Sequence, residues 1–207
     1  MKKLIAITLI LFATVSTAQD QFTVGMQKAF QLWGEGKIPE ASNMFERISS
    51  AELDNWLPAY YGAQVNTLAS FGEQDKEKLT QQLEKAQEFI DLAKAISPDN
   101  PEILVQQAMI YTAWMAYDGA TYGMTLSAKA VEIYQKALQL APDNPRVVFS
   151  KAEWDMGTAR YFGQDTAPYC KDIERALELF AKFKPATPFH PNWGKDRAEA
   201  TLEGCKQ

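Results

Sequence analysis

The sequence predicts an all-α protein, built as a solenoid of about four helix hairpins, three of them lengthened, and closed by a C-terminal capping helix. Three observations predict this class: a repeat of 44 to 46 residues, apolar positions at helical spacing, and turn signals at regular intervals. No stretch of useful length alternates apolar and polar residues, so strands are not expected.

The internal repeat is clearest in the middle of the chain. The segment AQEFIDLAKAISPDNPE at 86–102 aligns with AVEIYQKALQLAPDNPR at 130–146, and seven of the seventeen positions are identical. Weaker copies lie on both sides, so that four copies start at Ala41, Ala86, Ala130 and Ala176, which are 45, 44 and 46 residues apart. A match of this length at so regular a spacing indicates repeated structural units.

Each unit reads as two helices. Asn100 and Asn144 each precede a proline, a pattern typical of an N-cap followed by the first helical residue. Glycines are expected to separate the two helices of each pair, namely Gly34 and Gly36, Gly72, Gly119 and Gly123, and Gly163. The predicted helices cover 20–34, 38–50, 56–71, 75–96, 101–117, 122–140, 145–162, 167–183 and 193–205.

The first 18 residues read as a secretory signal. Lys2 and Lys3 precede an apolar run over residues 4–15, and the small residues at 16–18 predict cleavage before Gln19. The run is shorter than the roughly 20 residues that a membrane-spanning helix needs. The predicted domains are therefore a signal peptide at 1–18 and a repeat domain at 19–207, with units at 20–53, 54–98, 99–142 and 143–188 and a cap at 190–207. A periplasmic or secreted product of a Gram-negative bacterium is expected.

Charge excludes two classes of partner. Without Lys2 and Lys3, 19 basic residues stand against 26 acidic ones, a net charge near −7, and no basic cluster stands out. Neither a nucleic-acid surface nor a polybasic membrane patch is expected. No feature of the sequence indicates an oligomeric state.

The two cysteines are candidates for a disulfide. Cys170 lies near the start of the eighth predicted helix and Cys205 near the end of the ninth. Antiparallel packing of these neighbours brings the two ends together, and an oxidising compartment favours the bond. Two unrelated buried thiols are the alternative.

The repeat resembles the tetratricopeptide repeat (TPR) over nearly all of residues 19–207. That family's pattern, a small residue in the first helix and Ala, a bulky residue, a small residue and Pro in the second, is matched best by the third unit, with Ala108, Ala130, Tyr134, Ala137 and Pro142. The second unit matches with Gly62, Ala86, Ile90, Ala93 and Pro98. The resemblance implies a right-handed superhelix in which small residues let helices approach closely.

One departure concerns length. The small residue of the first helix and the Ala of the second are 12 residues apart in the first unit, but 24, 22 and 24 apart in the others, so three hairpins are lengthened. The aromatic and glycine residues at the hairpin tips and the closing PNWGKDRAE at 191–199 also look like small exported TPR proteins of Gram-negative envelopes.

Few residues favour an enzyme. His190, the single histidine, lies between prolines, and only a pairing with Cys170 would make it part of a nucleophilic site. No HExxH, CxxC, phosphate loop or GxSxG elbow is present after residue 18, so neither catalysis, a cofactor nor a metal is expected.

Aromatic residues crowd the tips of the later hairpins. They are Trp114, Tyr117, Tyr122, Trp154, Tyr161 and Phe162. They could fill the extra length of the hairpins as core, or form an exposed surface that binds a partner. The sequence leaves both interpretations open.

The predicted function is that of a non-catalytic scaffold that binds a protein or peptide of the cell envelope. The alternative is a solenoid that encloses a small ligand such as a peptide, glycan or lipid. The TPR resemblance implies that the first helices form the concave wall, whose predicted partner-binding residues are Met26, Phe30, Asn66, Val105, Met109, Thr112, Phe149, Glu153 and Met156. Methionine and aromatic side chains suit an adaptable peptide or helix.

Overall fold

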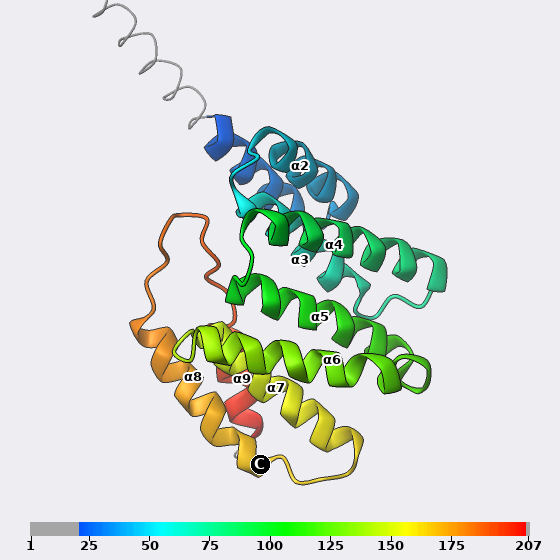
Figure 1. Ribbon diagram of the computed structural model, residues 1–207, viewed down its shortest axis with the longest axis vertical. Coiled ribbons are helices and arrows are strands. Elements are labelled where there is room, and N and C mark those ends of the chain that lie inside the picture. Colours follow the sequence, from blue (N-terminus) through cyan, green and yellow to red (C-terminus); the bar gives the residue numbers. More distant parts are fainter. Residues whose placement is uncertain (1–20, 206–207) are drawn as a thin grey trace, which may run out of the picture.

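The computed structural model describes residues 21–205, which form successive helix hairpins and a closing helix (Figure 1). The first hairpin pairs the helix over residues 21–34 with α2 (Ile38–Ala51), and the second pairs α3 (Trp56–Ser70) with α4 (Lys76–Ile96). The third consists of α5 (Pro101–Tyr117) and α6 (Gly119–Leu140), and the fourth of α7 (Pro145–Tyr161) and α8 (Cys170–Lys182). A short 3₁₀ turn, η1 (Ala167–Tyr169), precedes α8, and α9 (Lys195–Gly204) packs on α8. The described chain contains no strand, and the predicted all-α solenoid is confirmed.

The predicted helix starts at the two Asn-Pro sequences are also confirmed. The side chain of Asn100 accepts a hydrogen bond from the backbone N–H of Glu102, and that of Asn144 accepts one from Arg146. In both cases the next residue is a proline at the first helical position. The N–H of a residue at this position has no partner within the helix, so its absence in proline costs no hydrogen bond.

The third hairpin turns differently from the prediction. A single residue, Asp118, with φ −146° and ψ 86°, separates α5 from α6, and its side chain caps α6 by accepting from the backbone N–H of Thr121. Gly119 and Gly123 lie inside α6 and neither has a positive φ, so the prediction of a glycine break is wrong here. In the fourth hairpin the predicted helix over 167–183 begins as η1, and α8 itself starts at Cys170.

The small and bulky positions of the repeat form the core. The repeat alanines Ala41, Ala86, Ala130 and Ala176 are fully buried, as are the small residues Ala29 and Ala108 of the first helices. Gly62 shows how closely the helices approach, because a Cβ atom built there would lie 2.5 Å from the ring of Phe89. The close packing that the TPR-like pattern predicts is therefore present.

The described residues 21–205 contain no helix that is both long and apolar enough to cross a membrane. The predicted signal peptide, residues 1–18, lies outside the described residues.

Candidate functional site

The residues predicted to line a partner-binding wall are mostly not on the surface. Five of the nine are buried in the core, namely Met26, Asn66, Val105, Phe149 and Met156. The other four, Phe30, Met109, Thr112 and Glu153, are partly exposed. The buried five pack within and between hairpins, so in this structure they present no surface to another molecule.

A segment from the end of the chain lies against this wall. We call residues 183–194, which connect α8 to α9, the strap; it runs from the end of α8 towards the first hairpins and returns to α9 (Figure 1). The ring centroid of Phe189 lies 5.4 Å from that of Phe22 and 6.2 Å from that of Phe30. The backbone carbonyl of Phe189 accepts a 2.9 Å hydrogen bond from the hydroxyl of Tyr61. The strap thus contacts both of the first two hairpins.

The C-terminal half of the strap and α9 continue along the wall. The indole N–H of Trp193 donates a 2.7 Å hydrogen bond to the hydroxyl of Tyr60. Gly194 has a φ of +104°, and a Cβ atom there would lie 3.0 Å from the ring of Phe180. In α9, Arg197 forms a 2.6 Å ion pair with Glu153. Two predicted wall residues, Phe30 and Glu153, therefore contact the chain's own C-terminal segment.

A buried ion pair lies next to the strap. The side chains of Glu102 and Arg146 are 3% and 0% exposed, and the guanidinium donates two hydrogen bonds to the carboxylate, of 2.8 and 2.6 Å. The side-chain amide of Asn144 donates a third, of 2.6 Å, to Glu102. The guanidinium carbon of Arg146 lies 4.3 Å from the ring centroid of Phe183, the first residue of the strap. The pair satisfies the carboxylate fully, whereas Nη1 of Arg146 has no hydrogen-bond partner among the described residues.

Burial also sets the protonation of the groups around this pair. Burial, with a smaller contribution from the charge of Glu102, raises the pKa of Tyr60 well above its ordinary value. Burial likewise raises the pKa of Tyr61, so both hydroxyls stay protonated at neutral pH and can make the hydrogen bonds to the strap. Burial lowers the pKa of His190 in the strap, which favours the neutral imidazole.

The disulfide between Cys170 and Cys205 is confirmed. It joins the start of α8 to the end of α9, with a Cα–Cα distance of 6.1 Å. Between its two ends the chain passes through α8, the strap and α9, 35 residues in all. The bond therefore closes the ring of chain that contains the strap.

The aromatic residues of the hairpin tips are divided between core and surface. Tyr161 and Phe162 are 73% and 66% exposed, while Trp114, Tyr117, Tyr122 and Trp154 are partly buried. We call the apolar set at the tips of the second to fourth hairpins the hairpin-tip surface: Phe71, Tyr117, Tyr122, Met124, Tyr161 and Phe162. Met124 is the most exposed residue of this set, at 92%.

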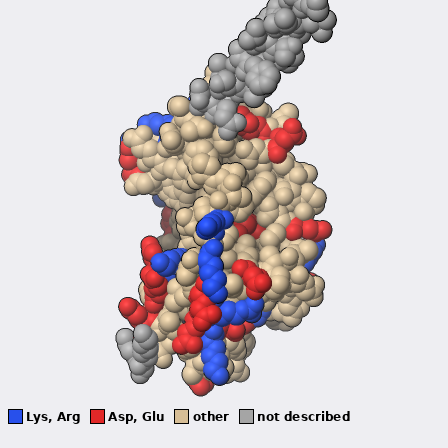
Figure 2. Space-filling model, turned by 90° about the vertical axis from the view of Figure 1, so that its left-hand side faces the viewer, with Lys and Arg blue, Asp and Glu red and all other residues tan. Residues whose placement is uncertain are grey.

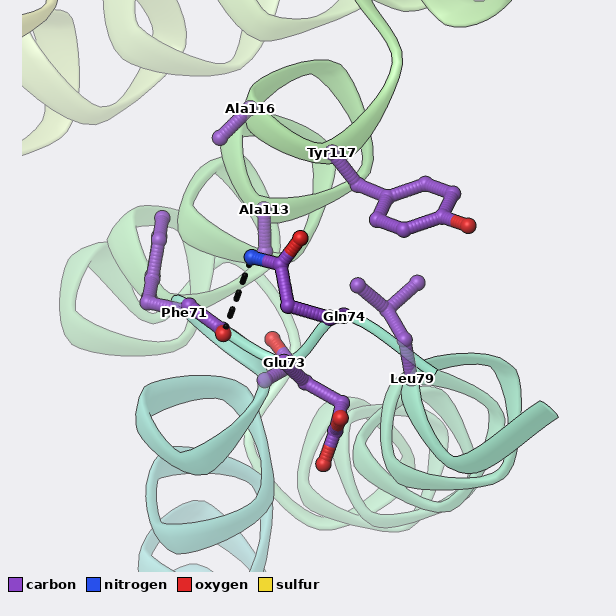
Figure 3. A pocket seen from close by; sticks show the side chains of 9 residues that line it. Phe71, Glu73, Gln74, Leu79, Ala113, Ala116 and Tyr117 are labelled. Carbon is purple, nitrogen blue, oxygen red and sulfur yellow. Dashed lines mark hydrogen bonds between the residues drawn. The ribbon is translucent and has the colours of Figure 1, made fainter. Parts of the chain in front are cut away.

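The tips of adjacent hairpins lie close together. A Cβ atom built on Gly119, at the tip of the third hairpin, would lie 3.8 Å from the ring of Tyr161 in the fourth. A pocket of about 420 Å³, including the space at its mouth, separates the second tip from the third (Figure 3). Its lining residues are Ser70, Phe71, Gly72, Glu73, Gln74, Leu79, Ala113, Ala116 and Tyr117.

The pocket is framed by two aromatic residues. Figure 3 shows Phe71 and Tyr117 on either side of Gln74, whose amide donates a 3.3 Å hydrogen bond to the carbonyl of Gly72. Two cations are near the tips: Lys76 opens α4 and Arg160 is in the last turn of α7. The tips therefore offer exposed aromatic faces with charges of both signs nearby, because Glu73 lines the pocket and Asp118 forms the third turn.

Among residues 21–205, no three His, Cys, Asp or Glu side chains are grouped so that they could hold a metal ion. Cys170, the conceivable nucleophile, is in the disulfide. Its suggested pairing with His190 is therefore contradicted.

Comparison with known proteins identifies the fold. No protein-family profile matches the sequence, and no curated protein matches it. Among solved structures, the HusA haemophore from Porphyromonas gingivalis is similar, with a TM-score of 0.77 and 24% sequence identity over 89% of this chain and 92% of the haemophore. The match to a thermophilic TPR protein of Thermus thermophilus covers 89% of this chain and 98% of that protein at 16% identity. Its TM-score of 0.42 is too low to indicate a shared fold. The chain therefore shares the overall fold of this haemophore.

Two features were missed in the sequence. Glu102 and Arg146 occupy equivalent positions of neighbouring repeats, 44 residues apart, and opposite charges at one repeat position were the available signal. The predicted helices leave residues 184–192 of the strap as a connection, although the twelve residues of the strap include three aromatic residues and a histidine, more than a solvent-exposed connection needs.

Proposed function

We propose that this protein is an exported, non-catalytic carrier, of divergent TPR type, that holds a planar apolar small molecule of the porphyrin class on its hairpin-tip surface. The observation that carries the proposal is the exposure of Phe71, Met124, Tyr161 and Phe162 at the hairpin tips, where Phe71 also lines a pocket. Large exposed apolar side chains mark binding surfaces. The pocket has only about 140 Å³ of interior space, less than the roughly 300–1,000 Å³ of small-ligand sites, so the ligand would lie on the tips and not inside the pocket.

The chemistry of the tips suits a flat ring system. Aromatic side chains bind a planar apolar ligand by offset stacking and edge contacts, and they bury much area for little lost side-chain freedom. Lys76 and Arg160 supply the positive charge that the carboxylates of a porphyrin would meet. The protein whose fold this chain shares is a haemophore, which by its name carries haem. That likeness supports the choice of ligand class.

Titration with haem tests the proposal. The absorbance band of haem and the fluorescence of the tryptophans should both change saturably when haem is added to the wild-type protein. Replacing Tyr161 and Phe162 with serine should weaken binding at least about tenfold, equivalent to about 1.4 kcal/mol, because two exposed rings are lost. Metal-free protoporphyrin is the second probe, and it should bind too, since the ring system is what the aromatic side chains contact.

A matched control removes exposed apolar groups elsewhere. Leu53 is 73% exposed and Leu140 48%, and both lie at the ends of the hairpins opposite the tips. Changing both to serine should leave haem affinity unchanged. Equal affinities for the tip variant and this control would exclude the hairpin tips as the site, and the absence of saturable binding by wild-type protein would exclude the function.

A second candidate is a scaffold for a protein or peptide of the cell envelope, which binds on the concave wall. It is favoured by Met109 and Thr112, which remain partly exposed on α5. The test is affinity capture from an envelope extract with wild type and with a Met109→Glu, Thr112→Glu variant. Charging Phe149 would not serve, because this side chain is 1% exposed and its replacement would unfold the core.

Export itself is part of the proposal. The predicted signal at 1–18 and the disulfide, which persists in oxidising compartments, both support a periplasmic or secreted protein. Intact-mass measurement of protein from the envelope fraction should find a chain that begins at Gln19. A full-length chain extracted only with detergent would contradict this.

A further inference from the structure

The strap resembles a bound peptide more than a loop. Its centre, residues 184–188, is exposed throughout, and it forms neither helix nor strand with the rest of the protein. On either side of this centre it is held by Phe183 over Arg146 and by Phe189 among the first two hairpins. Its last part is held more closely: the ring of His190 lies 5.9 Å from that of Trp56, Pro191 is buried, and Trp193 is bonded to Tyr60. Figure 2 shows the side of the molecule on which the strap lies: charges of both signs gather over the lower half, and in the upper half they lie mainly at the edges.

The contacts combine main-chain and side-chain recognition. Tyr61 donates to a backbone carbonyl of the strap, a bond that any residue could accept. The ring of Phe189 packs on Phe22 and Phe30, and Phe30 in turn lies 4.6 Å from the ring of Tyr61, so these rings form a receptacle for one aromatic side chain. Four residues later the indole of Trp193 donates to Tyr60. Grooves that bind extended peptides use the same division between main-chain bonds and pockets for particular side chains.

The strap does not supply hydrogen bonds to all the buried polar groups beneath it. Arg146 is fully buried, yet its Nη1 has no hydrogen-bond partner among residues 21–205, and the strap offers the guanidinium only the ring face of Phe183. Buried polar groups of a finished core are nearly always paired. Unpaired ones under an exposed segment are expected where that segment fills a polar groove incompletely.

We propose that the strap is a tethered ligand of the concave groove: it closes the groove to other chains and is displaced when an extended peptide with an aromatic residue and, four positions later, a tryptophan takes its place. The disulfide holds the two helices that flank the strap, α8 and α9, together. Because Cys170–Cys205 joins both flanking helices, the strap remains at an effective concentration in the millimolar range, which a free peptide must exceed. The groove is separate from the hairpin tips, so this inference does not depend on porphyrin binding.

The test opens the strap in the folded protein without removing it. A site-specific protease sequence replaces the exposed residues 184–188, and the purified, folded protein is cut there. The disulfide holds α9 in the cut oxidised form, and reduction then frees the C-terminal piece. The probe is a fluorescent synthetic peptide of residues 183–194, FKPATPFHPNWG, whose binding is measured by anisotropy in the intact, cut, and cut and reduced forms.

The expected order of affinity is intact weakest, cut intermediate, cut and reduced strongest, with at least about a tenfold difference between the first and the last. A peptide with Phe189→Ala should bind at least about tenfold more weakly, since the aromatic receptacle is left empty. A peptide with Lys184→Ser, at an exposed position, is the matched control and should bind like the original. Haem titration of the cut protein should be unchanged.

Each contrary result overturns the inference. If the cut protein loses its helical circular dichroism, the strap is a structural part of the core. If the cut protein stays folded and does not bind the peptide, or binds the Phe189→Ala peptide equally well, the groove does not recognise this chemistry. If intact protein binds the peptide as tightly as cut and reduced protein, the strap does not compete for the groove.

Discussion

Removing the charge of Glu102 tests whether the ion pair beneath the strap is desolvated. Both side chains of the Glu102–Arg146 pair are almost completely buried, and the carboxylate accepts three hydrogen bonds, two from Arg146 and one from Asn144. The substitution Glu102→Gln keeps the size of the side chain and removes its charge. The guanidinium of Arg146 is then buried without a counter-ion, because no other carboxylate within residues 21–205 forms an ion pair with it.

The expected loss is large because water cannot replace the missing charge. Breaking a buried pair by removing one partner costs about 3–5 kcal/mol. For a domain of this size, 1 kcal/mol shifts the melting temperature by about 2–4 °C, so the melting temperature should fall by roughly 6–20 °C. Circular dichroism at 222 nm, followed during heating and during urea titration, measures both quantities.

An exposed pair in the same protein provides the control. Asp99 and Lys136 also form an ion pair between distant parts of the chain, but their side chains are 62% and 51% exposed. The substitution Asp99→Asn should cost only about 0–1 kcal/mol. If Glu102→Gln costs no more than Asp99→Asn, the strap does not exclude water from the Glu102–Arg146 pair and the reasoning is refuted.

Three further predictions concern the disulfide, the closest helix contact and the strap histidine. Replacing Cys170 and Cys205 with serine should lower the free energy of unfolding by about 3–4 kcal/mol, measured by urea titration, because a 35-residue ring of chain is no longer closed. Gly62→Ala should cost about 1–3 kcal/mol by overpacking, whereas Gly157→Ala, at a helical position with no atom within 4 Å, should gain about 0.5–1 kcal/mol. Because burial lowers the pKa of His190, its contribution to stability is complete above about pH 6.5 and is lost as the pH falls below that value. His190→Gln should therefore reduce the loss of unfolding free energy between pH 7.5 and pH 5.

Each of these has a result that would contradict it. Wild-type protein with its disulfide reduced should match the double serine variant, and a stable reduced protein would contradict the ring-closure argument. Equal stability of the Gly62→Ala and Gly157→Ala variants would show that the helices can separate at no cost. An identical pH dependence in wild type and His190→Gln would show that the imidazole is solvated in the folded state.

The sequence was sufficient for what depends on short-range patterns. Asn100 and Asn144 act as caps because capping involves only the next two or three residues, and the helix bounds followed from that. The disulfide could be inferred because two neighbouring helices of similar length bring Cys170 and Cys205 to the same end. Asp118 was missed as the turn because a one-residue junction needs no glycine when its φ stays negative.

The concave wall shows where such reasoning stops. The TPR resemblance placed Val105, Phe149 and Met156 on the concave wall of the first helices, but it could not show what covers them. In lengthened hairpins the same positions pack within and between helix pairs, and the strap covers what remains of the face. Contacts between residues more than 120 positions apart leave no periodic trace in a single sequence.

Those distant contacts also change how the molecule unfolds. In an open solenoid each hairpin contacts only its neighbours, so the ends can melt separately. Here Tyr61 is bonded to a residue 128 positions later and Tyr60 to one 133 positions later, so in the closed state the first two hairpins are bonded to the end of the chain. The array is therefore expected to unfold as one cooperative unit. During synthesis the core of the first two hairpins can form from residues 26–113 alone, and the bonds of Tyr60 and Tyr61 to the strap form only after Trp193 has emerged.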